Sequence, residues 1–84
     1  MQVKQNIYPN ELSSARRRRH FSQKFVAVTI GKSQKMLSKY ERGALLPPMS
    51  TAAELSILYQ VELPELYPDL YRDLQVKIAR SLAK

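Results

Sequence analysis

The sequence predicts an all-α protein of five or six short helices. Three observations lead to this prediction. Two serines suited to the N-cap position, Ser22 and Ser33, stand before helix-forming stretches, and two glycines, Gly31 and Gly43, follow those stretches. Apolar residues recur every four positions near the C-terminus, and no stretch alternates as a half-buried strand does. With 84 residues, the chain has room for one domain.

The first helix is predicted to follow an N-terminal arm, residues 1–9. Asn10 is a good N-cap residue, so the helix is expected to begin there and to end near His20. Its inward-facing residues are predicted to be Leu12 and Ala15.

Two short helices come next, and we expect a tight turn between them. The second helix is capped by Ser22 and ends at Gly31, and the third is capped by Ser33 and ends at Gly43. Neither is long enough to be stable alone, so tertiary packing has to hold both. A turn as short as residues 31–33 sets two helices at about 90–120° to each other.

That crossing has three requirements, and this stretch meets all of them. Ala27 is small where the two helices would touch, Gly31 permits the turn, and Leu37 and Tyr40 form an apolar inner face on the third helix. The stretch from about Gln23 to Arg42 therefore predicts a helix-turn-helix.

The C-terminal third predicts three more helices. A fourth helix is expected to open at Ser50 or Thr51, because Thr51 and Glu54 have the spacing of a capping box. A short fifth helix is expected over residues 61–67, and a last helix over residues 68–84. The last helix carries one apolar seam, formed by Leu70, Leu74, Ile78 and Leu82.

Positive charge is concentrated in one part of the chain. The net charge is +7, and nine of the 14 lysines and arginines lie within residues 16–42, where Glu41 is the only acid. Residues 43–71 hold four acids and no lysine or arginine. This segregation predicts that one half of the molecule binds a polyanion.

The same region carries a family pattern. The chain resembles the Cro/C1-type (Xre family) helix-turn-helix domain over residues 10–67. This resemblance implies a compact five-helix, lambda-repressor-like DNA-binding domain, to which residues 68–84 add a C-terminal helix. The chain departs from the pattern at Gln60, where the family usually has glycine, and at Ile57 and Leu58, which make the fourth helix more apolar. The residues that carry the resemblance are Ser22, Gln23, Ala27, Gly31, Ser33, Leu37, Glu41, Arg42, Gly43 and Pro47.

The resemblance implies that the third helix reads double-stranded DNA, and its side chains suit that role. With Leu37 and Tyr40 inward, its polar face would enter the major groove. Gln34 can contact adenine through two hydrogen bonds, and Lys35 or Lys39 can reach guanine or phosphate. The candidate DNA-binding residues are Gln23, Lys32, Ser33, Gln34, Lys35, Ser38, Lys39, Arg42 and Arg17.

Arg16 and Glu41 are assigned a structural role. In the family, the matching arginine and acid pair with each other, which implies an ion pair between the first and third helices of this chain. Arg17, Arg18 and Arg19 form either a solvated fringe or a set of phosphate contacts, and both alternatives remain open.

A homodimer is expected because one recognition helix reads only about four to six base pairs. Two copies would bind a near-palindromic operator. The last helix could equally fold back over its own core, so both alternatives remain open. The candidate dimer interface consists of Ile57, Leu58, Leu70, Leu74, Ile78 and Leu82.

Other classes of function find little support. The chain has no cysteine and one histidine, so no metal site is expected. There is no catalytic triad or nucleotide fingerprint, so we expect no enzyme, cofactor or small-molecule ligand. No apolar run approaches 18 residues, which argues against a membrane protein, and a cytoplasmic protein of bacterial or phage type, nucleoid-associated when bound to DNA, is expected.

The sequence therefore predicts a transcriptional regulator, most simply a repressor that occludes RNA polymerase. One alternative is an antitoxin-type protein that binds a protein partner through its C-terminal helix and autoregulates its operon. Another is RNA or non-specific nucleic-acid binding. Base-stacking aromatics within the basic region would favour that last alternative, and most tyrosines lie outside it.

Overall fold

The computed structural model describes residues 7–83, which form six helices and no strand, so the all-α prediction is confirmed. Residues 1–6 of the expected arm, and residue 84 of the expected last helix, lie outside the described residues. The helices are α1 (Leu12–Arg18), α2 (Gln23–Thr29), α3 (Gln34–Glu41), α4 (Met49–Tyr59), α5 (Leu63–Leu66) and α6 (Pro68–Leu82).

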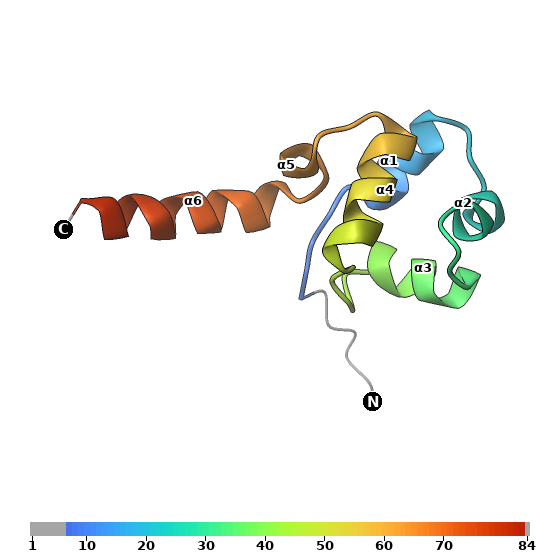
Figure 1. Ribbon diagram of the computed structural model, residues 1–84, viewed down its shortest axis with the longest axis horizontal. Coiled ribbons are helices and arrows are strands. Elements are labelled where there is room, and N and C mark those ends of the chain that lie inside the picture. The colour runs from blue at the N-terminus through green and yellow to red at the C-terminus, as the bar shows by residue number, and fades with distance from the viewer. Residues whose placement is uncertain (1–6, 84) are drawn as a thin grey trace.

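Two parts of the molecule differ in how they are packed. Helices α1–α5 pack against one another, while α6 projects from them and gives the molecule its longest dimension, 47 Å (Figure 1). We call residues 7–71 the body and residues 72–82 outer α6. None of the helices within residues 7–83 is both long and apolar enough to cross a membrane.

The core lies where the helices of the body meet, and each of α1–α5 contributes to it. Leu12 and Ala15 of α1 face inward, as the sequence predicts. Full burial of a leucine side chain contributes about 1.5–3 kcal/mol to folding, so this small core depends on a few residues. The largest fully buried side chains are Tyr59, Leu12, Leu37, Leu55, Leu66 and Val26.

The caps predicted for α2 and α3 are present. The hydroxyl of Ser22 accepts a hydrogen bond from the backbone N–H of Phe25 at 3.0 Å, and the hydroxyl of Ser33 accepts one from Met36 at 3.0 Å. Gly31 follows α2 with φ +69°, a conformation that glycine adopts without steric cost.

The start of α1 differs from the prediction. The helix begins at Leu12 rather than next to Asn10, and it ends at Arg18, before His20. The side-chain oxygen of Asn10 accepts from the N–H of Leu12 at 2.9 Å, while its amide nitrogen donates to the carbonyl of Tyr40 at 3.0 Å. Asn10 therefore also ties the segment before α1 to α3.

The start predicted for α4 is wrong. The helix begins at Met49 with Pro48 in the N-cap position and no side-chain cap. The proline ring holds φ at −58°, close to a helical value, so the first turn forms earlier than the serine and threonine predict. Thr51 lies inside that turn and is buried, and it forms no capping box with Glu54.

The corner after α4 keeps the conformation that a glycine would adopt. Gln60 has φ 58° and ψ 46°, which is the left-handed region. The departure from the family pattern at this position thus changes the residue and not the turn.

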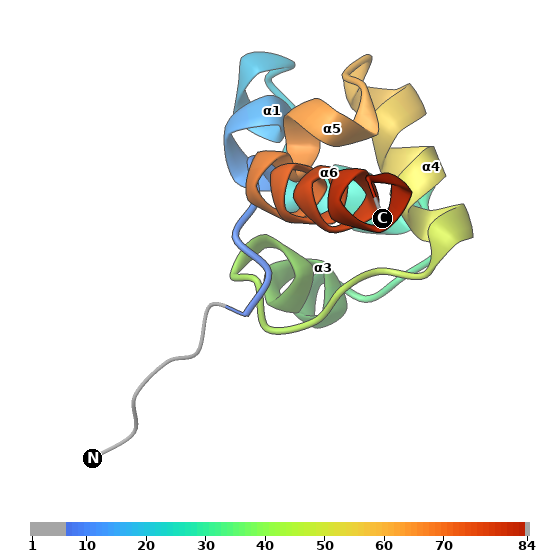
Figure 2. The ribbon, with the colours of Figure 1, turned by 90° about the vertical axis from the view of Figure 1, so that its left-hand side faces the viewer.

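Outer α6 does not fold back over the core. Leu70 and Tyr71, at the start of the helix, pack against the body. Every residue from 72 to 82 is exposed, and Figure 2 shows the helix pointing away from the body toward the viewer. The alternative of a last helix covering its own core along its length is therefore wrong.

Candidate nucleic-acid interface

Helix α2 lies across α3, as the turn between them requires. In Figure 1, α2 is seen end-on while α3 runs across the view. The N–H of Lys32 donates to the carbonyl of Ala27 at 2.9 Å, and that of Gly31 to Val28 at 3.2 Å. Two such bonds, with glycine in the left-handed region, are the usual way to end one helix and redirect the chain.

The inner face of the helix pair is closed. Ala27, Leu37 and Tyr40 are all buried, so the small residue of α2 meets the apolar stripe of α3. This packing determines which side of α3 remains at the surface.

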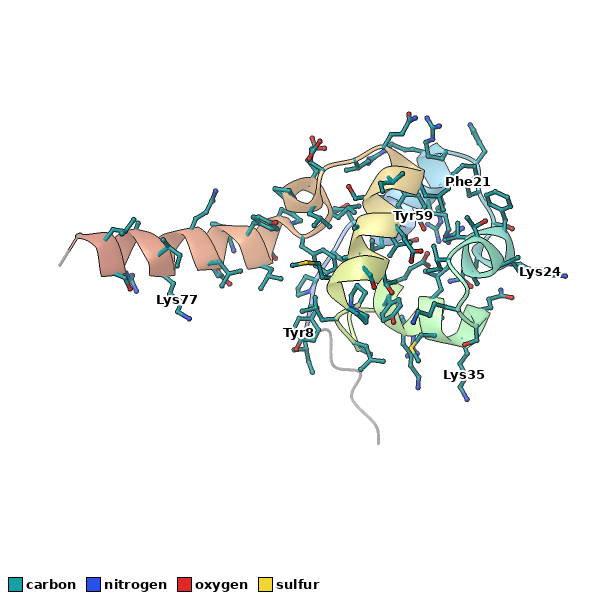
Figure 3. All side chains as sticks on the ribbon, viewed as in Figure 1. Tyr8, Phe21, Lys24, Lys35, Tyr59 and Lys77 are labelled. Atoms are coloured by element: carbon teal, nitrogen blue, oxygen red, sulfur yellow. The ribbon has the colours of Figure 1, made fainter. Side chains whose placement is uncertain are left out.

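The outer face of α3 carries the residues expected to read DNA. Gln34 and Lys35 are exposed, whereas Ser38 and Lys39 are half-buried. Lys35 points away from the body, and so does Lys24 at the start of α2 (Figure 3). Helix α3 therefore presents its first turn outward, which is the part of a recognition helix that enters a major groove first.

The structure groups most of the candidate DNA-binding residues. Gln23, Lys32, Ser33 and Arg42 lie on α2, in the turn or next to α3, and all are at least partly exposed. Arg17 is exposed but belongs to the last turn of α1. Helix α1 contacts α3 through the neighbouring Arg16, which pairs with Glu41, and Arg17 itself belongs to α1 and not to the helix-turn-helix.

The ion pair between Arg16 and Glu41 is present and is almost enclosed. The Nε of Arg16 lies 2.7 Å from Oε2 of Glu41, and the two side chains are 11% and 7% exposed. Arg16 also donates to the carbonyl of Phe21 at 3.0 Å. The hydrogen bond to Glu41 raises the pKa of Arg16 above its ordinary value, against the opposing effect of burial, so the arginine stays charged.

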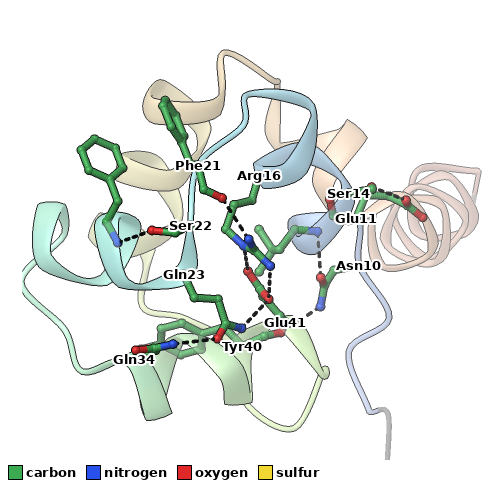
Figure 4. A network of polar contacts seen from close by, with 12 residues as sticks. Asn10, Glu11, Ser14, Arg16, Phe21, Ser22, Gln23, Gln34, Tyr40 and Glu41 are labelled. Carbon is green, nitrogen blue, oxygen red and sulfur yellow. Dashed lines mark hydrogen bonds and ion pairs between the residues drawn. The ribbon is translucent and has the colours of Figure 1, made fainter.

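Glu41 continues this network toward α3. Its Oε1 accepts a hydrogen bond from Nε2 of Gln23 at 2.9 Å, and Oε1 of Gln23 accepts one from Nε2 of Gln34 at 3.4 Å (Figure 4). A chain of contacts thus runs from the carboxylate of Glu41 through Gln23 to Gln34, the first residue of α3. The enclosed ion pair holds one end of this chain, and the exposed amide of Gln34 lies at the other.

This connection between the two glutamines was not predicted from the sequence. Gln23 was expected only as a DNA-binding residue, and Glu41 only as the partner of Arg16. Gln23 and Gln34 each follow a serine N-cap, so each is the first residue of its helix, and that shared position is the signal that could have linked them.

The candidate nucleic-acid interface carries an excess of positive charge. Glu41 is the only acid within residues 16–42, and its carboxylate faces Arg16. The other lysines and arginines of that segment are exposed or half-buried and have no carboxylate of the segment to pair with. In residues 7–83, no three histidine, cysteine or acidic side chains gather at a site that could hold a metal ion.

Two crossed helices with an outward, basic and amide-bearing first turn define the class of helix-turn-helix DNA-binding proteins. The family model described as helix-turn-helix, of the Cro/C1 type, matches residues 12–66, which is well over half of the chain. The protein therefore belongs to the Cro/C1-type (Xre) helix-turn-helix family. It is a DNA-binding transcriptional regulator that binds double-stranded DNA, and its family is a regulatory one rather than a family of enzymes.

No well-characterised protein and no solved structure shows a significant match to this chain.

Proposed function

We propose that this protein is a sequence-specific repressor that binds a near-palindromic operator as a homodimer. It carries out no catalysis, and it acts in the cytoplasm, on the nucleoid. The observation that carries this proposal is the chain of contacts that positions the amide of Gln34 at the outer edge of α3.

Gln34 has the hydrogen-bonding groups that adenine requires. A glutamine amide has two N–H donors and one carbonyl acceptor. One donor of Gln34 is used in the contact with Gln23, so a second donor and the acceptor remain free to bind N7 and N6 of an adenine in the major groove. Because the contact with Gln23 orders the side chain before DNA arrives, less conformational entropy is lost on binding.

The neighbouring residues suit contacts with the DNA backbone. The hydroxyl of Ser33 is used in capping α3, but the N–H groups of the first turn point out of the helix end, where an anionic phosphate is favoured. Lys32, Lys35 and Arg42 are exposed beside them. These contacts set the position of α3 on the duplex, while Gln34 reads a base.

Repression is the simplest outcome of such binding. Two copies of α3 would contact half-sites about one helical turn, roughly 34 Å, apart. A dimer seated across a promoter would block RNA polymerase through occupancy alone.

Selection from random duplex DNA, followed by measured binding of variants, tests this function. We expect a near-palindromic preference, and we expect Gln34→Ala to lose about 1–3 kcal/mol of binding free energy and to relax the preference at one base position. Lys35→Ala should lose a similar amount. Arg72→Ala removes the same charge from the exposed side of α6 and is the matched control, which should bind within about twofold of the wild type.

Two results would refute the proposal. If no sequence is enriched, the protein does not read DNA bases. If Gln34→Ala weakens binding equally to every sequence, Gln34 contacts only the backbone.

A second candidate function is favoured by the uncovered apolar side chains of outer α6. An antitoxin-type protein would use them to bind a protein partner and would use the DNA-binding face to regulate its own operon. The oligomeric state of the pure protein distinguishes the two candidates, because only the repressor proposal requires a dimer without a second protein.

A further inference from the structure

An open apolar groove lies between α6 and the body. Its volume is about 690 Å³. Leu46, Pro47 and Met49, around the start of α4, line the side formed by the body, and Leu74 and Ile78 line the side formed by α6. Several of these side chains are exposed, including Met49 at 85% and Ile78 at 54%.

None of the described residues fills this groove. Helix α6 continues straight past the body (Figures 1 and 2), and its outer half lines one side of the groove. The apolar side chains that line the groove extend as far as Leu82, which is 81% exposed. A contiguous apolar surface of this kind marks an interaction site.

We propose that the occupant of the groove is outer α6 of a second copy of this chain, packed antiparallel to α6 of the first. The arrangement is reciprocal, since a twofold axis passes between the middles of the two helices and each copy fills the groove of the other. Outer α6, which contacts little of its own body, then packs against the partner's body around the start of α4.

The charges of α6 favour the antiparallel direction. Asp69 and Asp73 lie in its first half, and Lys77 and Arg80 lie in its second half. At 100° per residue, Lys77 lies beside the apolar stripe, while Asp73, Arg80 and Asp69 lie progressively further toward the opposite side of the helix. Antiparallel packing places the acidic half of each helix alongside the basic half of the other, and Lys77 is the charged residue of these four nearest the contact.

Two further features fit the basic end of a partner helix. Arg72 lies 3.6 Å from Asp69 and 3.7 Å from Asp73, so the first half of α6 retains a net negative charge after this internal pairing. The body side of the groove comes from residues 43–71, a segment without lysine or arginine. None of the described residues lining that side is basic, so none of them repels Lys77 or Arg80 of the partner.

This inference rests on the homodimer of the proposed function and adds its interface. Sedimentation equilibrium of the full chain should show a dimer, and Ile78→Glu should raise its dissociation constant more than about tenfold. Val76→Glu is the matched control because Val76 is 44% exposed on the same helix but does not line the groove. We expect it to change the dissociation constant less than about threefold. A monomeric wild type, or equal effects of the two variants, would overturn the inference.

Disulfide trapping tests the relative direction of the two α6 helices. Because the chain has no cysteine of its own, only the introduced cysteines can form a disulfide. In the antiparallel pair, Tyr71 of one copy faces Leu82 of the other, so a mixture of Tyr71→Cys and Leu82→Cys chains should form a crosslinked heterodimer. Leu82→Cys alone should not crosslink, since its two copies would lie about 16 Å apart at 1.5 Å per residue. A disulfide requires Cα atoms within about 7 Å. Crosslinking of Leu82→Cys alone would show a parallel pair and contradict the proposal.

Binding to a half-site duplex separates this inference from the proposed function. Ile78→Glu should bind a single half-site as tightly as the wild type, which also shows that its body is folded, and should lose cooperative binding to the full operator. If the half-site is bound and the chain is monomeric throughout, the interface is wrong while base reading stands. If no half-site is bound by the wild type, the proposed function itself fails.

Discussion

The body and outer α6 use the same pattern of apolar residues with opposite results. Leu37 and Tyr40 are three positions apart on α3 and are buried, whereas Leu74, Ile78 and Leu82 are four positions apart on α6 and are exposed. Helical periodicity predicts that a segment is a helix and which of its faces is apolar. It does not predict what covers that face, because the covering residues come from elsewhere in the chain or from another chain.

Their ion pairs differ in the same way. Arg16 and Glu41 are enclosed between α1 and α3 at 2.7 Å, while Arg72 lies at 3.6 Å from Asp69 on the surface of α6. An enclosed pair is costly to break because one charge is left without a partner, and a surface pair contributes little. Stability should therefore depend on the body and hardly at all on outer α6.

The largest effect that we predict comes from breaking the enclosed pair. Glu41→Ala leaves the guanidinium of Arg16 and the amide of Gln23 without their acceptor, so the free energy of unfolding should fall by roughly 3–5 kcal/mol. Asp73→Ala removes the same charge from the surface pair and should cost about 0–1 kcal/mol. Urea unfolding followed by circular dichroism measures both values. Similar costs for the two variants would contradict the difference between the regions.

Truncating one leucine in each region tests the packing difference. Leu37→Ala opens a cavity in the body and should destabilise the protein by about 2–5 kcal/mol. Leu82→Ala removes a side chain that is 81% exposed, and in dilute protein it should cost within about 0.5 kcal/mol. If the cost of Leu82→Ala rises with protein concentration, outer α6 is covered by another copy of the chain, as inferred above.

Alkaline pH should weaken the body through its buried tyrosines. Burial raises the pKa of Tyr67 to about 12 and also raises that of Tyr59, from an ordinary value of 10. Above pH 10 the tyrosines lose their protons in the unfolded chain while they keep them in the folded protein. The free energy of unfolding is therefore unaffected by these tyrosines below pH 10 and falls as the pH rises toward 12. The slope should be up to about 1.4 kcal/mol per pH unit for each tyrosine.

Tyr67→Phe isolates the contribution of that residue. Its hydroxyl is buried and has no hydrogen-bond partner among the described residues, so the substitution should leave stability at pH 7 nearly unchanged. It should also reduce the alkaline slope. Unfolding curves at pH 7 and pH 11 measure both effects, and an unchanged slope would show that Tyr67 does not titrate as its burial requires.

The helices of the body and their caps could be predicted from residues close together in the sequence. The contacts between helices and the direction of α6 could not. The caps at Ser22 and Ser33 and the inward residues of α3 follow from spacing within one helix, so the sequence predicts them well. The contact from Gln23 to Gln34 depends on the angle between two helices, and the direction of α6 depends on the turn at Tyr67. Neither quantity is determined by residues close together in the chain.

The last prediction concerns the backbone strain at Gln60, in the corner after α4. Gln60 has φ 58°, a conformation that costs a non-glycine residue about 1–2 kcal/mol. Glycine removes this cost but loses more entropy on folding, so Gln60→Gly should stabilise the protein by only about 0.5–1 kcal/mol.

Gly31→Ala is the reverse experiment. A Cβ there meets nothing within 4 Å, so backbone strain alone should destabilise the protein, by roughly 1 kcal/mol. Destabilisation by Gln60→Gly would show that the corner at Gln60 is not strained, and thermal unfolding measures both changes.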